Sequence, residues 1–93
     1  MTRAELVDEL ARRRAIHREV AESIVDELFR AMLETLQEGG RVEIRGFGSF
    51  KVREYGGYTG RNPKTGQEIA VAPKRLPVFK ISRTLHEQLN QDI

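Results

Sequence analysis

One long amphipathic stretch, residues 18–38, constrains the fold of this chain more than any other feature. Its apolar residues recur at steps of three and four, which predicts a helix with a wide apolar stripe about 30 Å long. Gly39 and Gly40 predict the end of this helix, because glycine readily adopts the left-handed conformation found just past a helix. The apolar positions of the stripe are Val20, Ala21, Ile24, Val25, Leu28, Phe29, Met32, Leu33 and Leu36.

A shorter helix is predicted over residues 3–14, because Thr2 and Glu5 form a capping-box pattern ahead of apolar residues at helical spacing. Nine apolar positions are more than this short helix can cover. We therefore expect two chains to form an intertwined, symmetric dimer core, with an ordinary core inside one chain as the alternative. The predicted dimer interface comprises Ala21, Ile24, Val25, Leu28, Phe29, Met32, Phe47, Phe50 and Phe79.

From Arg41 onward the apolar period changes from helical to alternating. Residues 42–44 predict a short strand, Arg45 and Gly46 predict a turn, and a longer strand follows. After Gly66 the alternation resumes, which predicts a third strand that continues to about Phe79. A last helix is expected from the cap at residue 82 to about residue 90.

These elements predict one α+β domain over residues 1–93. Residues 1–40 are the expected helical dimerisation part, and residues 82–93 the expected C-terminal helix. Residues 41–81 are expected to form a three-stranded antiparallel sheet whose long hairpin arm covers about residues 53–72. An extended strand from Val52 to Pro63 would reach roughly 35 Å, so the arm should project from the domain.

The charge is distributed unevenly along the chain. Residues 1–40 contain six arginines and nine acidic residues, a net charge of −3, whereas residues 41–86 contain ten basic and three acidic residues, a net charge of +7. The C-terminal half is therefore the part expected to bind a polyanion. The cations expected on or near the strands, where they could contact phosphates, are Lys51, Arg53, Lys74, Arg75, Lys80 and Arg83.

The segment Gly60-Arg61-Asn62-Pro63-Lys64-Thr65-Gly66 is predicted to form the tip of the arm. Arg61 and Asn62 can reach hydrogen-bond acceptors on the floor of the DNA minor groove, and Lys64 can neutralise phosphate. Pro63 can enter a base step and partly unstack it. The alternative for an Asn-Pro dipeptide is a turn with no further role.

Together with Gly46-Phe47-Gly48-Ser49-Phe50 and Pro77-Val78-Phe79-Lys80, this tip motif resembles the HU and integration host factor family of bacterial DNA-bending proteins, over essentially the whole chain. The resemblance implies a cytoplasmic, nucleoid-associated protein that binds double-stranded DNA as a dimer. It implies that each arm enters the minor groove and that Pro63 wedges into a base step. The sequence leaves open an identical or a related partner subunit, specific or non-specific binding, and the bend angle.

Within this family, residues 43–50 look more like the beta subunit of integration host factor than like HU. That likeness implies that Arg45 reaches the DNA and that Glu43 helps to position it, the alternative being a surface ion pair between the two. Arg3 matches a usual cation of the family and is a further candidate for contact with DNA. Tyr55 and Tyr58 stand where relatives usually carry arginine, so we expect fewer phosphate contacts on the arm. Both tyrosines remain predicted DNA contacts, because a tyrosine can donate a hydrogen bond or pack on a sugar.

The inventory of residues argues against other classes of protein. The chain has no cysteine and two distant histidines, so we expect no metal site, cofactor, enzyme activity or small-molecule substrate. Its apolar runs are too short to span a membrane. A helical dimerisation module that binds protein by strand addition, and an RNA-binding variant of the same fold, remain as alternatives. Binding that is independent of salt would favour the protein-binding module.

Overall fold

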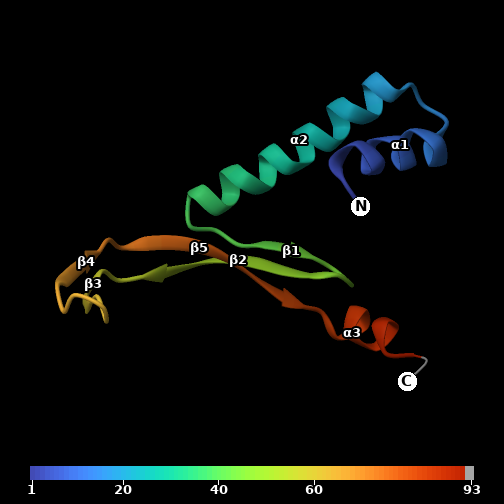
Figure 1. Cartoon of the computed structure of the whole chain (residues 1–93). Helices are drawn as coiled ribbons and strands as arrows, with labels where there is room; N and C mark the ends of the chain where they lie inside the picture. Colours follow the sequence, from blue (N-terminus) through green and yellow to red (C-terminus); the bar gives the residue numbers. More distant parts are fainter. Residues whose placement is uncertain (92–93) are drawn as a thin grey trace.

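The computed structural model describes residues 1–91, which form three helices and five strands (Figure 1). The second helix rises obliquely from the sheet, with the first helix beside its far end, and a thin hairpin extends from one end of the sheet. The molecule measures 60 × 38 × 27 Å, with a radius of gyration of 19.4 Å. A compact chain of this length would have a radius of about 12 Å, so the elongation expected for a projecting arm is present.

The first helix, α1 (Arg3–Arg14), has the predicted bounds. The Thr2 hydroxyl oxygen accepts a hydrogen bond from the Glu5 amide at 3.1 Å, which satisfies one of the free N–H groups of the first turn. At the other end three arginines occupy the last turn, where positive charge complements the helix dipole. The helix stops at Ala15, whose φ of 53° is left-handed.

The second helix, α2 (Arg18–Gln37), ends one residue before the predicted boundary. His17 precedes it and makes no side-chain capping bond. Gly39 has a φ of 83°, and its amide donates to the Leu36 carbonyl, so the predicted glycine termination is confirmed. The last turn of α2 contains no basic residue, in contrast to α1.

Three antiparallel strands form the main sheet in the order β1–β2–β5: β1 (Val42–Ile44), β2 (Gly48–Tyr55) and β5 (Lys74–Ile81). The predicted turn at Arg45 and Gly46 joins β1 to β2, and the Phe47 amide closes it on the Ile44 carbonyl at 2.9 Å. Backbone approach is closest at Gly48, where an added Cβ would lie 2.5 Å from the Lys80 carbonyl oxygen. Glycine is therefore required at this point of the sheet.

The arm is a separate two-stranded sheet, formed by β3 (Tyr58–Arg61) and β4 (Glu68–Val71). The prediction of one continuous strand from residue 69 to residue 79 is therefore wrong. Residues 56–57 and 72–73, here called the arm joint, interrupt both strands between the Tyr55–Lys74 pair and the Tyr58–Val71 pair. Pro73 has no amide hydrogen to donate to a ladder and Gly56-Gly57 favours coil over strand, which explains the break.

The short helix α3 (Arg83–Leu89) follows β5 and has the predicted cap. The Ser82 hydroxyl oxygen accepts from the Leu85 amide at 3.1 Å. The Ser82 amide itself donates to the Phe47 carbonyl at 2.9 Å, which ties the start of α3 to the turn after β1. The end of the predicted helix at residues 92–93 lies outside the described residues.

Within residues 1–91, the buried apolar core of the single chain consists of Val7, Ala21 and Val25, with flanking side chains from α1 and the α1–α2 connection. The prediction that Ala21 and Val25 face a partner is therefore wrong: α1 covers them. Ile24, Leu28 and Phe29 stay exposed, and Met32 is half-buried.

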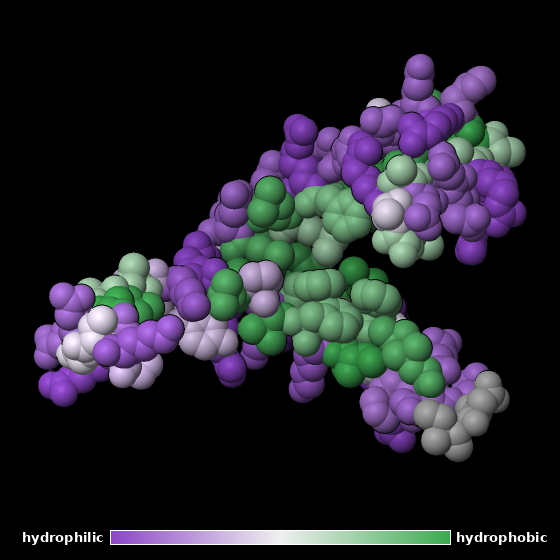
Figure 2. All heavy atoms as spheres, in the orientation of Figure 1, coloured by the Kyte–Doolittle hydropathy of each residue, from purple (hydrophilic) through white to green (hydrophobic). Residues whose placement is uncertain are grey.

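Three phenylalanines cluster on the helix-facing side of the sheet. Phe79 stacks on Phe50 with ring centroids 4.8 Å apart and on Phe47 at 5.5 Å, in the tilted geometry that aromatic pairs favour. Phe47 and Phe79 nevertheless remain 45% and 42% exposed. Figure 2 shows the apolar surface as a green band between α2 and the sheet, open to solvent on the side in view.

Candidate nucleic-acid interface

One face of the main sheet carries a row of cations. Alternation along β2 places Lys51, Arg53 and Tyr55 on the same side, away from Phe50 and Val52. The antiparallel register places Ser49 opposite Lys80 and Tyr55 opposite Lys74, so these two lysines share that side. We call Lys51, Arg53, Lys74 and Lys80 the basic face. Within residues 1–91 none of the four forms an ion pair.

Arg75 does not belong to the basic face, although the sequence analysis grouped it with these cations. Its cross-strand partner is Glu54, on the opposite side of the sheet from Tyr55 and Lys74. The guanidinium of Arg75 donates to carbonyl groups at the end of α2. The grouping overlooked the two-residue period of a strand, which sends neighbouring side chains to opposite faces.

The tip loop, residues 62–67, is closed by its own hydrogen bonds. The Asn62 amide donates to the Gln67 carbonyl at 2.9 Å, and the Gly66 amide donates to the Asn62 carbonyl at 2.7 Å. The side-chain Oδ1 of Asn62 accepts from the Lys64 amide at 2.9 Å, an Asx-turn that wraps around Pro63. Arg61, Pro63 and Lys64 are exposed, whereas Asn62 is half-buried and shapes the turn.

Two tyrosines lie on either side of the arm joint. Tyr55 ends β2 on the same side as the basic face and opposite Lys74, and Tyr58 begins β3 with 65% of its surface exposed. A hollow of about 480 Å³ lies between them and is lined in part by Lys74 and Val71. The structure thus brings both phenol groups next to the path from the basic face to the tip.

Arg45 lies in the exposed turn after β1. The ion pair considered between Glu43 and Arg45 is not present in the described part of the chain. Glu43 instead pairs with Arg41 at 3.4 Å, two residues in the other direction. Arg41 and Arg45 both line a hollow of about 300 Å³ whose other walls include Ser49, Lys80 and Ser82. Arg41 was not among the predicted DNA contacts, although it lies in the basic half of the chain, four residues before Arg45.

Two other predicted cations have acidic partners within the chain. Arg83 is almost fully exposed and lies 3.0 Å from Glu87 one turn along α3, a kind of pair that contributes little. Arg3 donates twice to Asp26, at 2.8 and 2.7 Å, and once to Glu22 at 3.2 Å. Hydrogen bonding from Arg3 lowers the pKa of Asp26 below its usual value. Arg3 therefore fastens α1 to α2 and is not a free cation.

Other classes of site find no support in the described part of the chain. Across residues 1–91, no three His, Cys, Asp or Glu side chains gather closely enough to hold a metal ion. No helix in that range combines the length and apolarity needed to cross a bilayer.

Comparison with known proteins gives one consistent result. Residues 1–90 match the family model described as bacterial DNA-binding protein. Integration host factor subunit beta of Pseudoalteromonas atlantica is 40% identical, over 100% of this chain and 98% of the relative. The same subunit of Erwinia tasmaniensis is 43% identical, over 97% of this chain and 96% of the relative.

Solved structures agree with the sequence relatives. The HU protein of Anabaena, crystallised with DNA, superposes with a TM-score of 0.82 at 30% identity, over 96% of this chain and 97% of that chain. HU from Thermotoga maritima superposes with a TM-score of 0.68 at 26% identity, over 96% and 98%. The chain therefore belongs to the bacterial DNA-binding protein family of HU and integration host factor, and its sequence is similar to the beta subunits of the latter.

Proposed function

We propose that this protein is an architectural DNA-binding protein of the bacterial nucleoid, which acts as a dimer and bends double-stranded DNA with its two arms. The observation that carries this proposal is the closed tip loop, with Pro63 exposed between Arg61 and Lys64, at the end of a hairpin that extends from the basic face. A turn that served only to reverse the chain would not need a cation on each side of its proline.

The small core of the single chain supports dimer formation. Three buried side chains are few for the 91 residues that the structure describes, and the exposed apolar band faces the space between α2 and the sheet. A second chain placed there would cover Leu28 and Phe29 together with the phenylalanine cluster. An identical chain and a related subunit both fit this requirement, because each would bring a matching helix.

The basic face supports phosphate contact without sequence readout. Its four cations have no intrachain partner in the described residues, so a phosphate backbone would not have to displace an acid from them. Contacts of this kind fix the position of a protein on a duplex but carry no sequence information directly. The hollow around Arg45 and Arg41 is a candidate for an additional contact at the opposite end of the sheet from the arm.

Pro63 is the proposed wedge and its neighbours are the proposed anchors. A wedge must present a rigid apolar surface, and the local hydrogen bonds of the tip loop hold the proline ring in that exposed position. Arg61 and Lys64 flank it and would bind groove-floor acceptors and phosphate. Tyr55 and Tyr58 would pack on sugars or donate hydrogen bonds to phosphates where relatives use charge.

A strand-addition adaptor is the second candidate, because β3 and β4 form a two-stranded sheet with free edges within residues 1–91. The two candidates differ in their dependence on salt. Binding through the basic face should weaken steeply as salt rises, whereas main-chain pairing should change little. An RNA duplex of equal length tests the remaining alternative.

The decisive experiment measures bending by fluorescence transfer between the ends of an intact duplex and of a nicked duplex. With Pro63→Ala we expect a smaller bend and weaker binding on the intact duplex, because unstacking a base step costs roughly a few kcal/mol that the wedge must offset. Binding to nicked DNA should be spared, since the nick already relieves part of that cost. Arg61→Ala with Lys64→Ala is the matched comparison and should weaken binding to both. An unchanged bend with Pro63→Ala at saturating protein would show that the proline is only a turn residue.

A further inference from the structure

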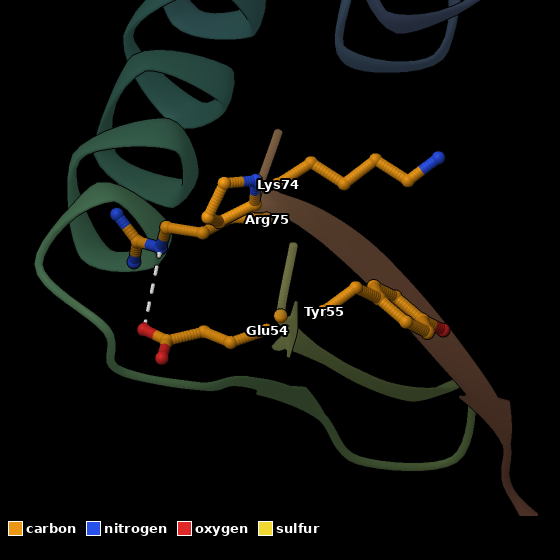
Figure 3. Close-up of a pocket in the computed structure, with 6 residues that line it drawn as sticks. Glu54, Tyr55, Lys74 and Arg75 are labelled. Atoms are coloured by element: carbon orange, nitrogen blue, oxygen red, sulfur yellow. Dashed lines mark ion pairs between the residues drawn. The ribbon is translucent and has the colours of Figure 1, made fainter. Parts of the chain in front are cut away.

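Arg75 connects the base of the arm to the dimerisation helix. Its Nη1 donates to the Gln37 carbonyl at 3.2 Å and its Nη2 donates to the Leu36 carbonyl at 3.3 Å, both at the end of α2. Its Nε also lies 3.8 Å from Oε1 of Glu54 on the neighbouring strand (Figure 3). In the same view Lys74 and Tyr55 point away from this cluster.

The end of α2 is suited to receive such a cation. The last carbonyls of a helix have no partners within the helix and carry partial negative charge. α2 has no basic residue of its own in its last turn, and Glu34 and Glu38 add negative charge there. Arg75 therefore supplies, from a distant strand, the positive charge that this helix end lacks. It donates to the Gln37 carbonyl and adds a second donor to the Leu36 carbonyl, which also accepts from the Gly39 amide.

The position of this contact along the sheet gives it a mechanical consequence. The Glu54–Arg75 pair is the next-to-last pair of the β2–β5 ladder, and Tyr55–Lys74 is the last. Beyond it, the arm joint leaves both strands without ladder partners until Tyr58 and Val71. The contact with α2 is thus made one step before the strands separate from the main sheet.

We propose that Arg75 is a positioning residue: it fixes the base of the arm to α2, so that arm motion begins at the arm joint and not deeper in the sheet. This positioning role adds to the proposed DNA-bending function. It depends on that function only for the predicted effect of Arg75 on DNA binding. The direction of each arm would then be set relative to the helix that meets the partner chain, and not by the two-stranded ribbon alone, which is marginal by itself.

Amide hydrogen exchange of the full chain without DNA tests this proposal directly. In Arg75→Ala we expect amides of residues 53–55 and 74–76 to exchange about two- to five-fold faster relative to the core amide of Val25, as expected for loss of a charge at a helix end. Referring each rate to Val25 separates a local effect from a general loss of stability. Lys74→Ala is the matched control, because it removes one charge from the adjacent position on the other face.

A graded variant and two opposing outcomes sharpen the test. Arg75→Lys keeps the charge but lacks the rigid planar fork of the guanidinium, so its exchange rates should fall between those of wild type and Arg75→Ala. Equal acceleration in Lys74→Ala and Arg75→Ala would overturn the proposal. So would an unchanged ratio of ladder to core exchange in Arg75→Ala.

DNA binding provides a second readout that separates positioning from phosphate contact. Arg75→Ala should weaken binding to intact duplex without changing the slope of log affinity against log salt, whereas Lys74→Ala should reduce that slope by about one. A reduced slope with Arg75→Ala would make Arg75 a phosphate contact and would overturn its positioning role. If the wild-type chain failed to bind DNA, the proposed function would be refuted, and the exchange rates would still decide the role of Arg75.

Discussion

Leu28→Ala should weaken the dimer while leaving the α1–α2 core in place. Leu28 lies in the middle of α2 and is 56% exposed in the single chain. Full burial of a leucine side chain stabilises by about 1.5–3 kcal/mol. The dimer buries the exposed half of Leu28, and truncation to alanine removes that contribution, which is about 1 kcal/mol per chain. A symmetric dimer contains the residue twice. The expected loss of about 2 kcal/mol corresponds to a roughly 30-fold larger dissociation constant.

Sedimentation equilibrium over a range of protein concentrations measures that constant. Glu27→Ala is the control, since Glu27 is exposed and helical geometry places it on the polar side of α2. It should leave association unchanged. Leu28→Glu introduces a charge into the predicted dimer interface and should impair folding and association together. The reasoning fails if the dimer dissociation constants of Leu28→Ala and wild type differ by less than about threefold. It also fails if the wild-type chain is a well-folded monomer at micromolar concentration.

Three further outcomes follow from the structure. Gly48→Ala should lower the free energy of unfolding by about 1–3 kcal/mol in urea titrations, because its Cβ would lie 2.5 Å from the Lys80 carbonyl oxygen, whereas Gly56→Ala meets nothing within 4 Å and should be tolerated. Neutralising each cation of the basic face should lower the salt slope of DNA binding by about one, and an unchanged slope with all four neutralised would misplace the interface. Because Arg3 depresses the pKa of Asp26, that carboxylate stabilises the fold above its unfolded pKa and loses the contribution as pH falls through its lower folded pKa. Arg3→Ala should therefore flatten the decline in thermal stability below about pH 4, and equal acid sensitivity in both proteins would contradict this.

The helix ends were predictable because their signals are local. Thr2, Ser82 and Gly39 each act within a few residues of the boundary they set, and all three do so in the structure. The hairpin of β1 and β2 and its turn at Gly46 were also predictable, since the apolar alternation and the glycine together specify a short hairpin.

The features that the sequence analysis missed depend on tertiary geometry. Ala21 and Val25 belong to the same stripe as Leu28, and only the position of α1 decides which part of the stripe is covered within the chain. Arg75 and its two partners at the end of α2 are separated by 38 and 39 positions in the sequence, and the periodicity of neighbouring residues cannot predict such a contact. The break at Pro73 had a local signal, the proline itself, which the alternation of the neighbouring residues outweighed in the prediction.

The tip loop has a consequence for the entropy of DNA binding. Its hydrogen bonds join residues 62–67 only to one another, so its conformation is already set before DNA arrives. Such preorganisation removes the cost of ordering the recognition turn from the association equilibrium. The remaining loss of conformational freedom falls on the arm joint, where four residues lie outside both ladders. Under the proposed insertion of the tip into a groove, the DNA therefore has to restrict the direction of the arm, while the shape of the turn is provided in advance.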